Sequence, residues 1–372
     1  MSVLYEKMPA RRELTVVSAD GTRIHVEEYG SPDGPTVVLS HGWTCSTLFW
    51  APVVRGLSAD FRVIAYDQRG HGRSAAPATR TGYGTGALAD DLEAVLEAVL
   101  PAGQQAVLAG HSMGGMTIMA AYGRAAVRGR TAAVLLASTG SGRLLGMSRV
   151  LPPRFTSRRL RRFFHRQLLV SRMPLGPVTP VAKAALKFGV LGAGSSPEQV
   201  AFTARIVHAC RARQRSAWGR VLSVLDLDAE LAAITAPTAV LVGTADKLTP
   251  KVHARGMADA LPNCTGLTEL SGLGHMTPIE DPPAVESVIR GLVADHLTSG
   301  HPTSDHHASD QNGSDHHQSD QPVSDQPTSG RRKSDRTTSD RTKQARATAP
   351  AAEHVTEHVT GESAAVEEEK SA

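Results

Sequence analysis

Short apolar runs, bounded by turn residues, recur along the chain from about residue 13 to residue 297. The first two, Glu13–Ser18 and Arg23–Tyr29, alternate apolar and polar positions around Asp20-Gly21, which predicts a β-hairpin. The later runs lack polar alternation, as expected of strands that a sheet buries on both faces. They are Thr36–Ser40, Arg62–Tyr66, Ala106–Ala109, Ala133–Ala137, Thr238–Val242 and the strand-like Leu267–Leu270.

Stretches with helical spacing separate these strands. In Thr85–Leu100 the apolar residues recur every three or four positions, with acidic residues opposite them. Met113–Arg128 and Pro282–Leu297 are also predicted as helices. Because strands alternate with helices, we expect an α/β fold with a mostly parallel sheet covered on both faces.

Two regions interrupt this alternation. No strand pattern occurs over about residues 140–226, so we expect a helical cap inserted between the core segments 13–139 and 227–297. From residue 298 to residue 372, a serine recurs every five positions as far as Ser339, and the sequence EHVT occurs twice. Because this tail has almost nothing apolar to bury, we expect it to be disordered and to act as a linker or solubilising segment.

The strongest chemical signal is Gly110-His111-Ser112-Met113-Gly114, which matches the pattern G-x-S-x-G. A predicted strand precedes it and a predicted helix follows, so a sharp turn would raise the Ser112 hydroxyl above the sheet. The helix N-terminus behind Ser112 favours developing negative charge. We therefore predict that Ser112 is a nucleophile.

A serine nucleophile needs a base, and that base needs a carboxylate to hold its tautomer. His275, in Gly272-Leu273-Gly274-His275-Met276, is the expected base. Asp246, in the loop after Thr238–Val242, is the expected acid. An acid one strand earlier is excluded, because no Asp or Glu lies between residues 98 and 197. Glu280 and Asp281 are expected to cap the last helix.

An oxyanion also needs two preorganised donors. The backbone N–H of Met113, directly after the nucleophile, is the first candidate. The N–H of Trp43, in His41-Gly42-Trp43 after an early strand, is the second. We expect the Trp43 indole to wall the acyl pocket.

These elements, together with the segment Asp67–Ser74 (DQRGHGRS), resemble the α/β-hydrolase superfamily from about Glu13 to Leu297. The resemblance implies an eight-stranded sheet, a cap after the sixth strand and no cofactor. It also implies that Arg69 and His71 are structural. Related epoxide hydrolases and haloalkane dehalogenases need aspartate at the position of Ser112, so serine there argues against both. The HGGG motif of lipases is also absent.

The predicted activity is hydrolysis of a carboxylic ester or related acyl bond of a small-molecule substrate, through an acyl-enzyme. One alternative is a cofactor-free perhydrolase or haloperoxidase-like enzyme, in which peroxide replaces water. Another is a non-catalytic ligand-binding homologue on the same scaffold.

Charge is distributed unevenly, although the formal net charge is only +4. Fourteen Arg and Lys residues lie between residues 98 and 197, nine of them arginines from Arg143 to Arg172. Leu160, Phe163, Phe164, Leu168 and Leu169 fall on one side of a predicted helix there. One interpretation of this basic cap is a solvated face. Two others are peripheral contact with an anionic membrane and electrostatic attraction of an anionic substrate such as an acyl thioester. No nucleic-acid-binding module accompanies the charge, so no nucleic acid is expected as a partner.

The three cysteines, Cys45, Cys210 and Cys264, are too few and too widely spaced for a disulfide framework or a zinc site, and no metal is predicted. No apolar run is long enough for a signal peptide or a transmembrane helix, which favours the cytoplasm. The pattern predicts no particular oligomeric state.

Overall fold

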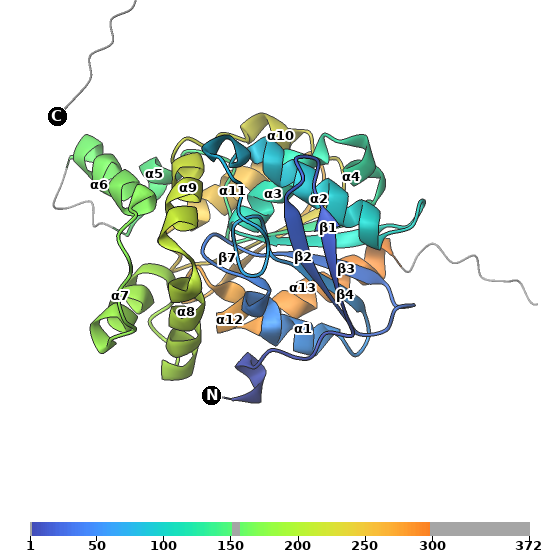
Figure 1. The fold of residues 1–372 in the computed structure, drawn as a ribbon, viewed down its shortest axis with the longest axis horizontal. Helices are drawn as coiled ribbons and strands as arrows, with labels where there is room; N and C mark the ends of the chain where they lie inside the picture. The colour runs from blue at the N-terminus through green and yellow to red at the C-terminus, as the bar shows by residue number, and fades with distance from the viewer. Residues whose placement is uncertain (1, 151–156, 298–372) are drawn as a thin grey trace, which may run out of the picture. The chain divides into compact units, whose positions relative to one another are not determined.

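A single mixed sheet organises the chain in the computed structural model, which describes residues 2–150 and 157–297. The strand order is β1-β2-β4-β3-β5-β6-β7-β8 (Figure 1). β1 and β2 form the predicted hairpin, β2 pairs antiparallel with β4, and the remaining neighbours pair in parallel. The strands are β1 (Arg12–Val17), β2 (Arg23–Tyr29), β3 (Thr36–Ser40), β4 (Arg62–Tyr66), β5 (Ala106–His111), β6 (Thr131–Ala137), β7 (Thr238–Gly243) and β8 (Cys264–Leu270). The predicted α/β class with an eight-stranded, mostly parallel sheet is confirmed.

Helices cover both faces of the sheet, because the side chains of each strand point alternately to either side. Val38 and Leu108 belong to a core cluster with residues of α2 and α3, whereas Leu39 and Ala109 belong to a second cluster with residues of α1 and α13. Figure 1 shows these two pairs of helices on opposite faces of the sheet. The helices of the core are α1 (Ala51–Leu57), α2 (Thr85–Val99), α3 (Met113–Tyr122), α4 (Ala125–Gly129), α11 (Lys251–Ala260), α12 (Thr277–Glu280) and α13 (Pro282–His296). Short 3-10 turns are η1 (Val3–Tyr5), η2 (Thr47–Trp50) and η3 (Arg80–Gly82).

The helix predicted over Met113–Arg128 is two helices, so that prediction was wrong in its extent. α3 ends at Tyr122, and Arg124 adopts an extended backbone before α4 begins. This turn brings the Arg124 guanidinium within 2.6 Å of both Asp90 and Glu93 on α2. Two ion pairs to a neighbouring helix therefore accompany the break.

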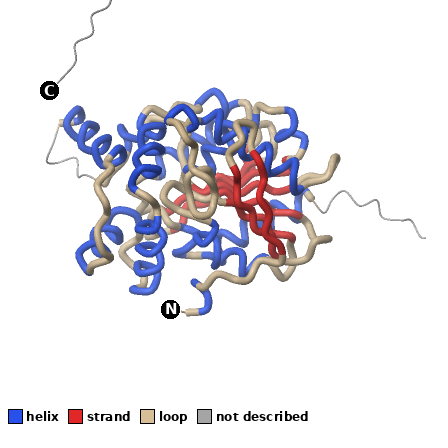
Figure 2. The backbone as a smooth tube through the Cα atoms, viewed as in Figure 1, coloured by secondary structure: helices blue, strands red, loops and turns tan. Residues whose placement is uncertain are grey.

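Between β6 and β7 the chain forms the helices α5 (Leu144–Met147), α6 (Arg158–Val170), α7 (Pro180–Val190), α8 (Pro197–Ala209), α9 (Ala212–Ser223) and α10 (Asp228–Ala232). Figure 2 shows most of them gathered on one side of the strands. We use the word cap for α5–α9 and the chain that connects them. The predicted cap boundaries, 140 and 226, stay predictions. Two stretches lie outside the described residues: 151–156 within the predicted cap, and the predicted tail, 298–372.

α9 anchors the cap to the core. The indole N–H of the fully buried Trp218 donates to the carbonyl of Arg69 at 3.0 Å, and its ring packs edge-on against Tyr83. On the same helix, the Ser216 hydroxyl donates to the carbonyl of Val170 at the end of α6, at 2.6 Å. α9 therefore joins the outer cap helices to the loop after β4.

α6 is the basic amphipathic helix that the sequence predicted. Ser157 caps its N-terminus by accepting the N–H of Leu160 at 3.3 Å. The side chains of Phe163 and Phe164 remain 52% and 47% exposed. Membrane contact by this face stays a prediction. Within the described ranges, no helix has the length and apolarity needed to cross a bilayer.

Candidate active site

Ser112 occupies the tight turn between β5 and α3. Its backbone lies at φ 51° and ψ −116°, a conformation that non-glycine residues rarely adopt. Such strain persists only where the surroundings over-determine it, and the N–H of Ser112 donates to the carbonyl of Ala137 on β6 at 3.0 Å. The side chain is half-buried at the edge of a cavity.

The glycines around this turn allow the backbones to approach closely. A Cβ on Gly110 would lie 2.5 Å from the backbone nitrogen of Gly115. A Cβ on Gly114 would lie 2.0 Å from the carbonyl oxygen of Ser40 on β3. The G-x-S-x-G pattern therefore reflects steric requirements on both sides of the serine.

Asp246 and His275 meet at the carboxyl ends of β7 and β8, and both are buried. Asp246 Oδ2 lies 2.8 Å from His275 Nδ1. Asp246 Oδ1 accepts the backbone N–H groups of Leu248 at 2.8 Å and Thr249 at 2.9 Å, which fix the carboxylate. Because the carboxylate only accepts, Nδ1 carries the proton and Nε2 retains its lone pair.

His275 and Ser112 line the same cavity, so the structure brings all three predicted residues to one place. Within the described residues, no hydrogen bond joins the Ser112 hydroxyl to His275. Catalytic hydrogen bonds are often long in structures without substrate and shorten when one binds.

The loop that carries His275 is tied to the cap. The His275 N–H donates to the carbonyl of Val190 at the end of α7, at 2.8 Å. The carboxylate of Glu280 accepts the N–H of Gly274 at 3.0 Å, the N–H of Gly192 at 2.7 Å and the Ser195 hydroxyl at 2.9 Å. Glu280 therefore braces the base loop against the cap.

The prediction that Glu280 and Asp281 both cap the last helix holds for Asp281 alone. The Asp281 side chain accepts the N–H of Ala284 at 3.1 Å at the start of α13. The prediction that Glu280 caps this helix was wrong, because the hydrogen-bond partners of its carboxylate lie on the His275 loop and the cap.

His111, the residue before Ser112, contacts the loop that carries His275, a contact that the sequence did not reveal. Its Nε2 lies 2.8 Å from the carbonyl of His275, so Nε2 must carry the proton and donate. Burial, with a further contribution from His275, lowers the pKa of His111 well below its usual range. The ring is therefore neutral and links the turn at Ser112 to the loop that carries His275.

The loop Asp67–Ser74 supports the segment that follows β3. Asp67 Oδ1 accepts the N–H of Thr47 at 2.7 Å, and His71 Nε2 accepts the N–H of Thr44 at 3.3 Å. Arg69 is buried and pairs with Asp91, with its Nε 2.7 Å from Oδ2. These contacts agree with the structural roles that the resemblance implied for Arg69 and His71.

Met113 and Trp43, the predicted sources of the oxyanion donors, flank Ser112. Met113 is the first residue of α3, where backbone N–H groups lack partners within the helix. Trp43 lines the cavity, and its indole N–H donates to the carbonyl of Arg215 on α9 at 3.0 Å. The indole thus forms part of the cavity wall, as expected, while the oxyanion roles of both amides stay predictions.

The cavity above Ser112 has a volume of about 600 Å³, within the range of small-molecule sites. The cap supplies much of its lining, and most of the lining side chains are apolar. Those from the cap include Leu144, Leu145, Leu168, Leu169, Leu175, Leu186, Phe188, Val207 and Leu222. The cavity therefore suits an apolar group that projects from a carbonyl held at Ser112.

Comparison with known proteins places this geometry in a family. The family model of the alpha/beta hydrolase fold matches residues 35–282. RutD of Variovorax paradoxus, assigned as a carbamate hydrolase, is 32% identical over 249 residues, which are 65% of this chain and 85% of RutD. The crystal structure of the esterase RhEst1 from Rhodococcus sp. ECU1013 has a TM-score of 0.58 at 26% identity, covering 76% of this chain and 99% of RhEst1.

A third relative shares only part of its length with this chain. EphD of Mycobacterium tuberculosis, assigned as an oxidoreductase, is 42% identical over 113 residues, which are 30% of this chain and 19% of EphD. The assigned reactions of these relatives differ, so they do not define one substrate for this chain. The family model, in contrast, matches about two thirds of the chain. The chain therefore belongs to the alpha/beta hydrolase fold family.

Proposed function

We propose that this hydrolase cleaves a carboxylic ester with an apolar acyl group, using Ser112, His275 and Asp246. The observation that carries the proposal is the buried Asp246–His275 pair beside Ser112, at the base of a largely apolar cavity. Asp246 fixes the proton of His275 on Nδ1, so Nε2 is free to accept the proton of Ser112.

The chemistry is a two-step acyl transfer. His275 takes the proton of the Ser112 hydroxyl as its oxygen attacks the ester carbonyl. The backbone N–H groups of Met113 and Trp43 stabilise the tetrahedral oxyanion. His275 then protonates the departing alcohol, and water, activated by the same ring, hydrolyses the acyl-enzyme.

The cavity supports an acyl chain longer than acetyl. Each methylene that moves from water to an apolar wall contributes about 0.8 kcal/mol, or roughly fourfold in kcat/KM. A series of p-nitrophenyl esters should therefore show rising kcat/KM with chain length until the cavity is filled.

Labelling with a fluorophosphonate probe, read by intact mass, tests the nucleophile. Wild type should gain one adduct and Ser112→Ala none, with both proteins equally folded by circular dichroism. If Ser112→Ala kept its esterase activity, the proposed nucleophile would be wrong. A folded wild type that neither reacted nor turned over esters would favour a ligand-binding homologue.

A carbamate is the second candidate substrate, favoured by the 32% identity to RutD over 85% of that protein. The same residues would attack a carbamate carbonyl, so the comparison requires matched p-nitrophenyl ester and carbamate substrates. Faster carbamate turnover would replace the ester proposal. Adding peroxide and acetate to the same assay tests for a perhydrolase.

A further inference from the structure

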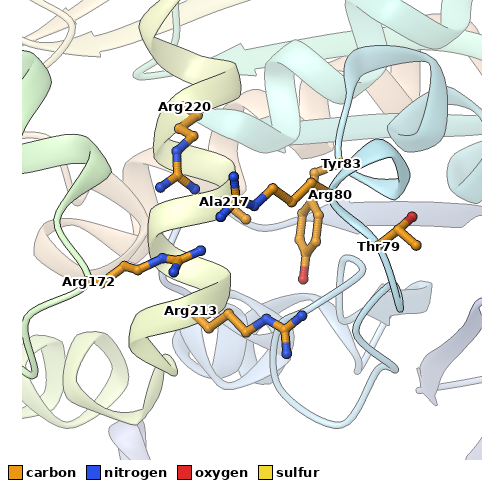
Figure 3. A pocket seen from close by; sticks show the side chains of 7 residues that line it. All are labelled: Thr79, Arg80, Tyr83, Arg172, Arg213, Ala217 and Arg220. Atoms are coloured by element: carbon orange, nitrogen blue, oxygen red, sulfur yellow. The ribbon is translucent and has the colours of Figure 1, made fainter. Parts of the chain in front are cut away.

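A second cavity, of about 380 Å³, lies where the cap meets the core (Figure 3). It shares no lining residue with the cavity above Ser112. It is bordered by η3 in the core, by α9 and by the chain that follows α6. Its lining residues are Thr79, Arg80, Tyr83, Arg172, Arg213, Ala217 and Arg220.

Helical spacing creates one wall of this cavity. Arg213, Ala217 and Arg220 are separated by four and three positions on α9, which places them on the same face of the helix. Ala217 contributes only a methyl group and leaves open space between the two arginines. Figure 3 shows Arg172 reaching toward this face from the chain after α6, and Arg80 reaching toward it from η3.

The four arginines lack carboxylate partners in the part of the chain that the structure describes. Several arginines elsewhere pair closely with acids, as Arg69 does with Asp91 at 2.6 Å. Desolvation lowers the pKa of Arg220, and the charges of Arg172 and Arg80 lower it further. Gathering like charges without a counter-charge is unfavourable, so the cavity is electrostatically complementary to an anion.

We propose that Arg80, Arg172, Arg213 and Arg220 form a binding site for a phosphate-bearing polyanion that bridges the cap and the core. A guanidinium presents parallel N–H donors that match the oxygens of a phosphate group. Tyr83 and Thr79 line the same space, and the phenol of Tyr83 can add a further donor. One carboxylate would neutralise only one of the four guanidinium charges. The site therefore favours a ligand with two or more negative charges.

The site draws on both parts of the molecule. Arg80 belongs to the core, whereas Arg172, Arg213 and Arg220 belong to the cap. A bound polyanion would therefore cross-link α9 and the chain after α6 to η3. This inference does not depend on the proposed esterase activity, because binding is measured without a substrate.

Isothermal titration of the full chain with pyrophosphate at low ionic strength tests the proposal. We expect one site per chain, with affinity that falls as salt is added. Arg172→Ala and Arg220→Ala should each weaken binding about tenfold or more, since each removes charge-assisted hydrogen bonds. Ala217→Leu should weaken binding about tenfold or more, because its side chain occupies the space between Arg213 and Arg220 while leaving every charge in place.

Arg23→Ala is the matched control, because Arg23 is exposed at the start of β2, outside this cavity, and its loss removes the same charge. It should leave the affinity nearly unchanged. Circular dichroism and urea unfolding verify that each variant is folded. No pyrophosphate binding to wild type would overturn the site. Binding that Ala217→Leu left unchanged, or that Arg23→Ala weakened as much as Arg172→Ala does, would also overturn it, by indicating general surface attraction.

Vesicles distinguish the two sources of phosphate. If vesicles containing phosphatidic acid displace pyrophosphate, and phosphatidylcholine vesicles do not, the ligand is a lipid headgroup. If neither displaces it, the ligand is a soluble phosphorylated compound. Both results retain the phosphate site, provided that Ala217→Leu weakens the binding concerned.

Discussion

Replacing Asp246 with asparagine should disable the base without unfolding the protein. Asp246 Oδ1 accepts two backbone N–H groups, from Leu248 at 2.8 Å and Thr249 at 2.9 Å. Backbone donors cannot become acceptors, so the single oxygen of an asparagine must occupy this position. Its NH₂ group then faces Nδ1 of His275, which must accept. The imidazole proton moves to Nε2, which can no longer take the proton of Ser112.

The expected magnitudes differ for activity and stability. The wrong tautomer costs about 10⁴-fold in kcat in serine hydrolases, equivalent to roughly 5.5 kcal/mol. The two backbone hydrogen bonds remain, although a neutral acceptor weakens each by about 1 kcal/mol. The Thr249 hydroxyl, 2.8 Å from Oδ2 and 3.0 Å from the Ser138 carbonyl, can accept from the new amide while it donates to Ser138. Unfolding should therefore become easier by about 2–3 kcal/mol at most.

The assay is kcat on a p-nitrophenyl ester, measured beside urea unfolding of the same preparation. Asp259→Asn, an exposed position on α11, is the control for the same chemical change and should behave as wild type. The tautomer argument would be refuted by a normally folded Asp246→Asn variant that keeps more than about a tenth of kcat.

Three further predictions concern other parts of the molecule. Glu280→Gln should lower kcat about ten- to hundredfold by loosening the His275 loop, because an amide cannot accept all of the hydrogen bonds that the carboxylate accepts. Unchanged kcat would exclude a positioning role for Glu280. Below pH 6.5 the free energy of unfolding should fall, because burial lowers the folded-state pKa of His41 to about 4 and that of His71 to about 3. In that window only the unfolded chain takes up these protons, so each ring removes at most about 1.4 kcal/mol per pH unit. From pH 7 to pH 5.5 the loss should be roughly 1.2 kcal/mol per ring, measured by urea unfolding. If α6 contacts membranes, replacing both Phe163 and Phe164 with serine should reduce co-sedimentation with anionic vesicles about tenfold or more. Equal co-sedimentation of the variant and wild type would argue against that contact.

The strands and the nucleophile turn could be predicted because their signals are local. The turn at Ser112 is encoded by glycines on both sides and by the run Ala106–Ala109 directly before it. Asp246 and His275 could be located because each follows a strand, and parallel strands end at the same edge of a sheet.

What the sequence could not reveal depends on distant segments. Glu280 resembles a helix cap because it precedes a helix, but its partners Gly192 and Ser195 lie 88 and 85 positions earlier in the chain. The arginine cavity likewise combines η3, the chain after α6, and α9, and only the excess of basic residues in the cap was visible beforehand.

The His275 loop is attached to Val190, Gly192 and Ser195. This attachment divides the inserted segment into two parts that should tolerate substitutions to different degrees during evolution. Residues Val190, Gly192 and Ser195 are hydrogen-bonded to the segment that carries His275, the proposed base, and Glu280, so substitutions there must preserve its position. Among the described residues, 157–189 supply cavity walls and support that attachment only through Lys187, whose ammonium donates to the carbonyl of Ser195 at 2.8 Å. Exchanging 157–189 for the corresponding helices of a relative, with a junction before Val190, would therefore transfer substrate preference between enzymes while leaving the reactive groups in register.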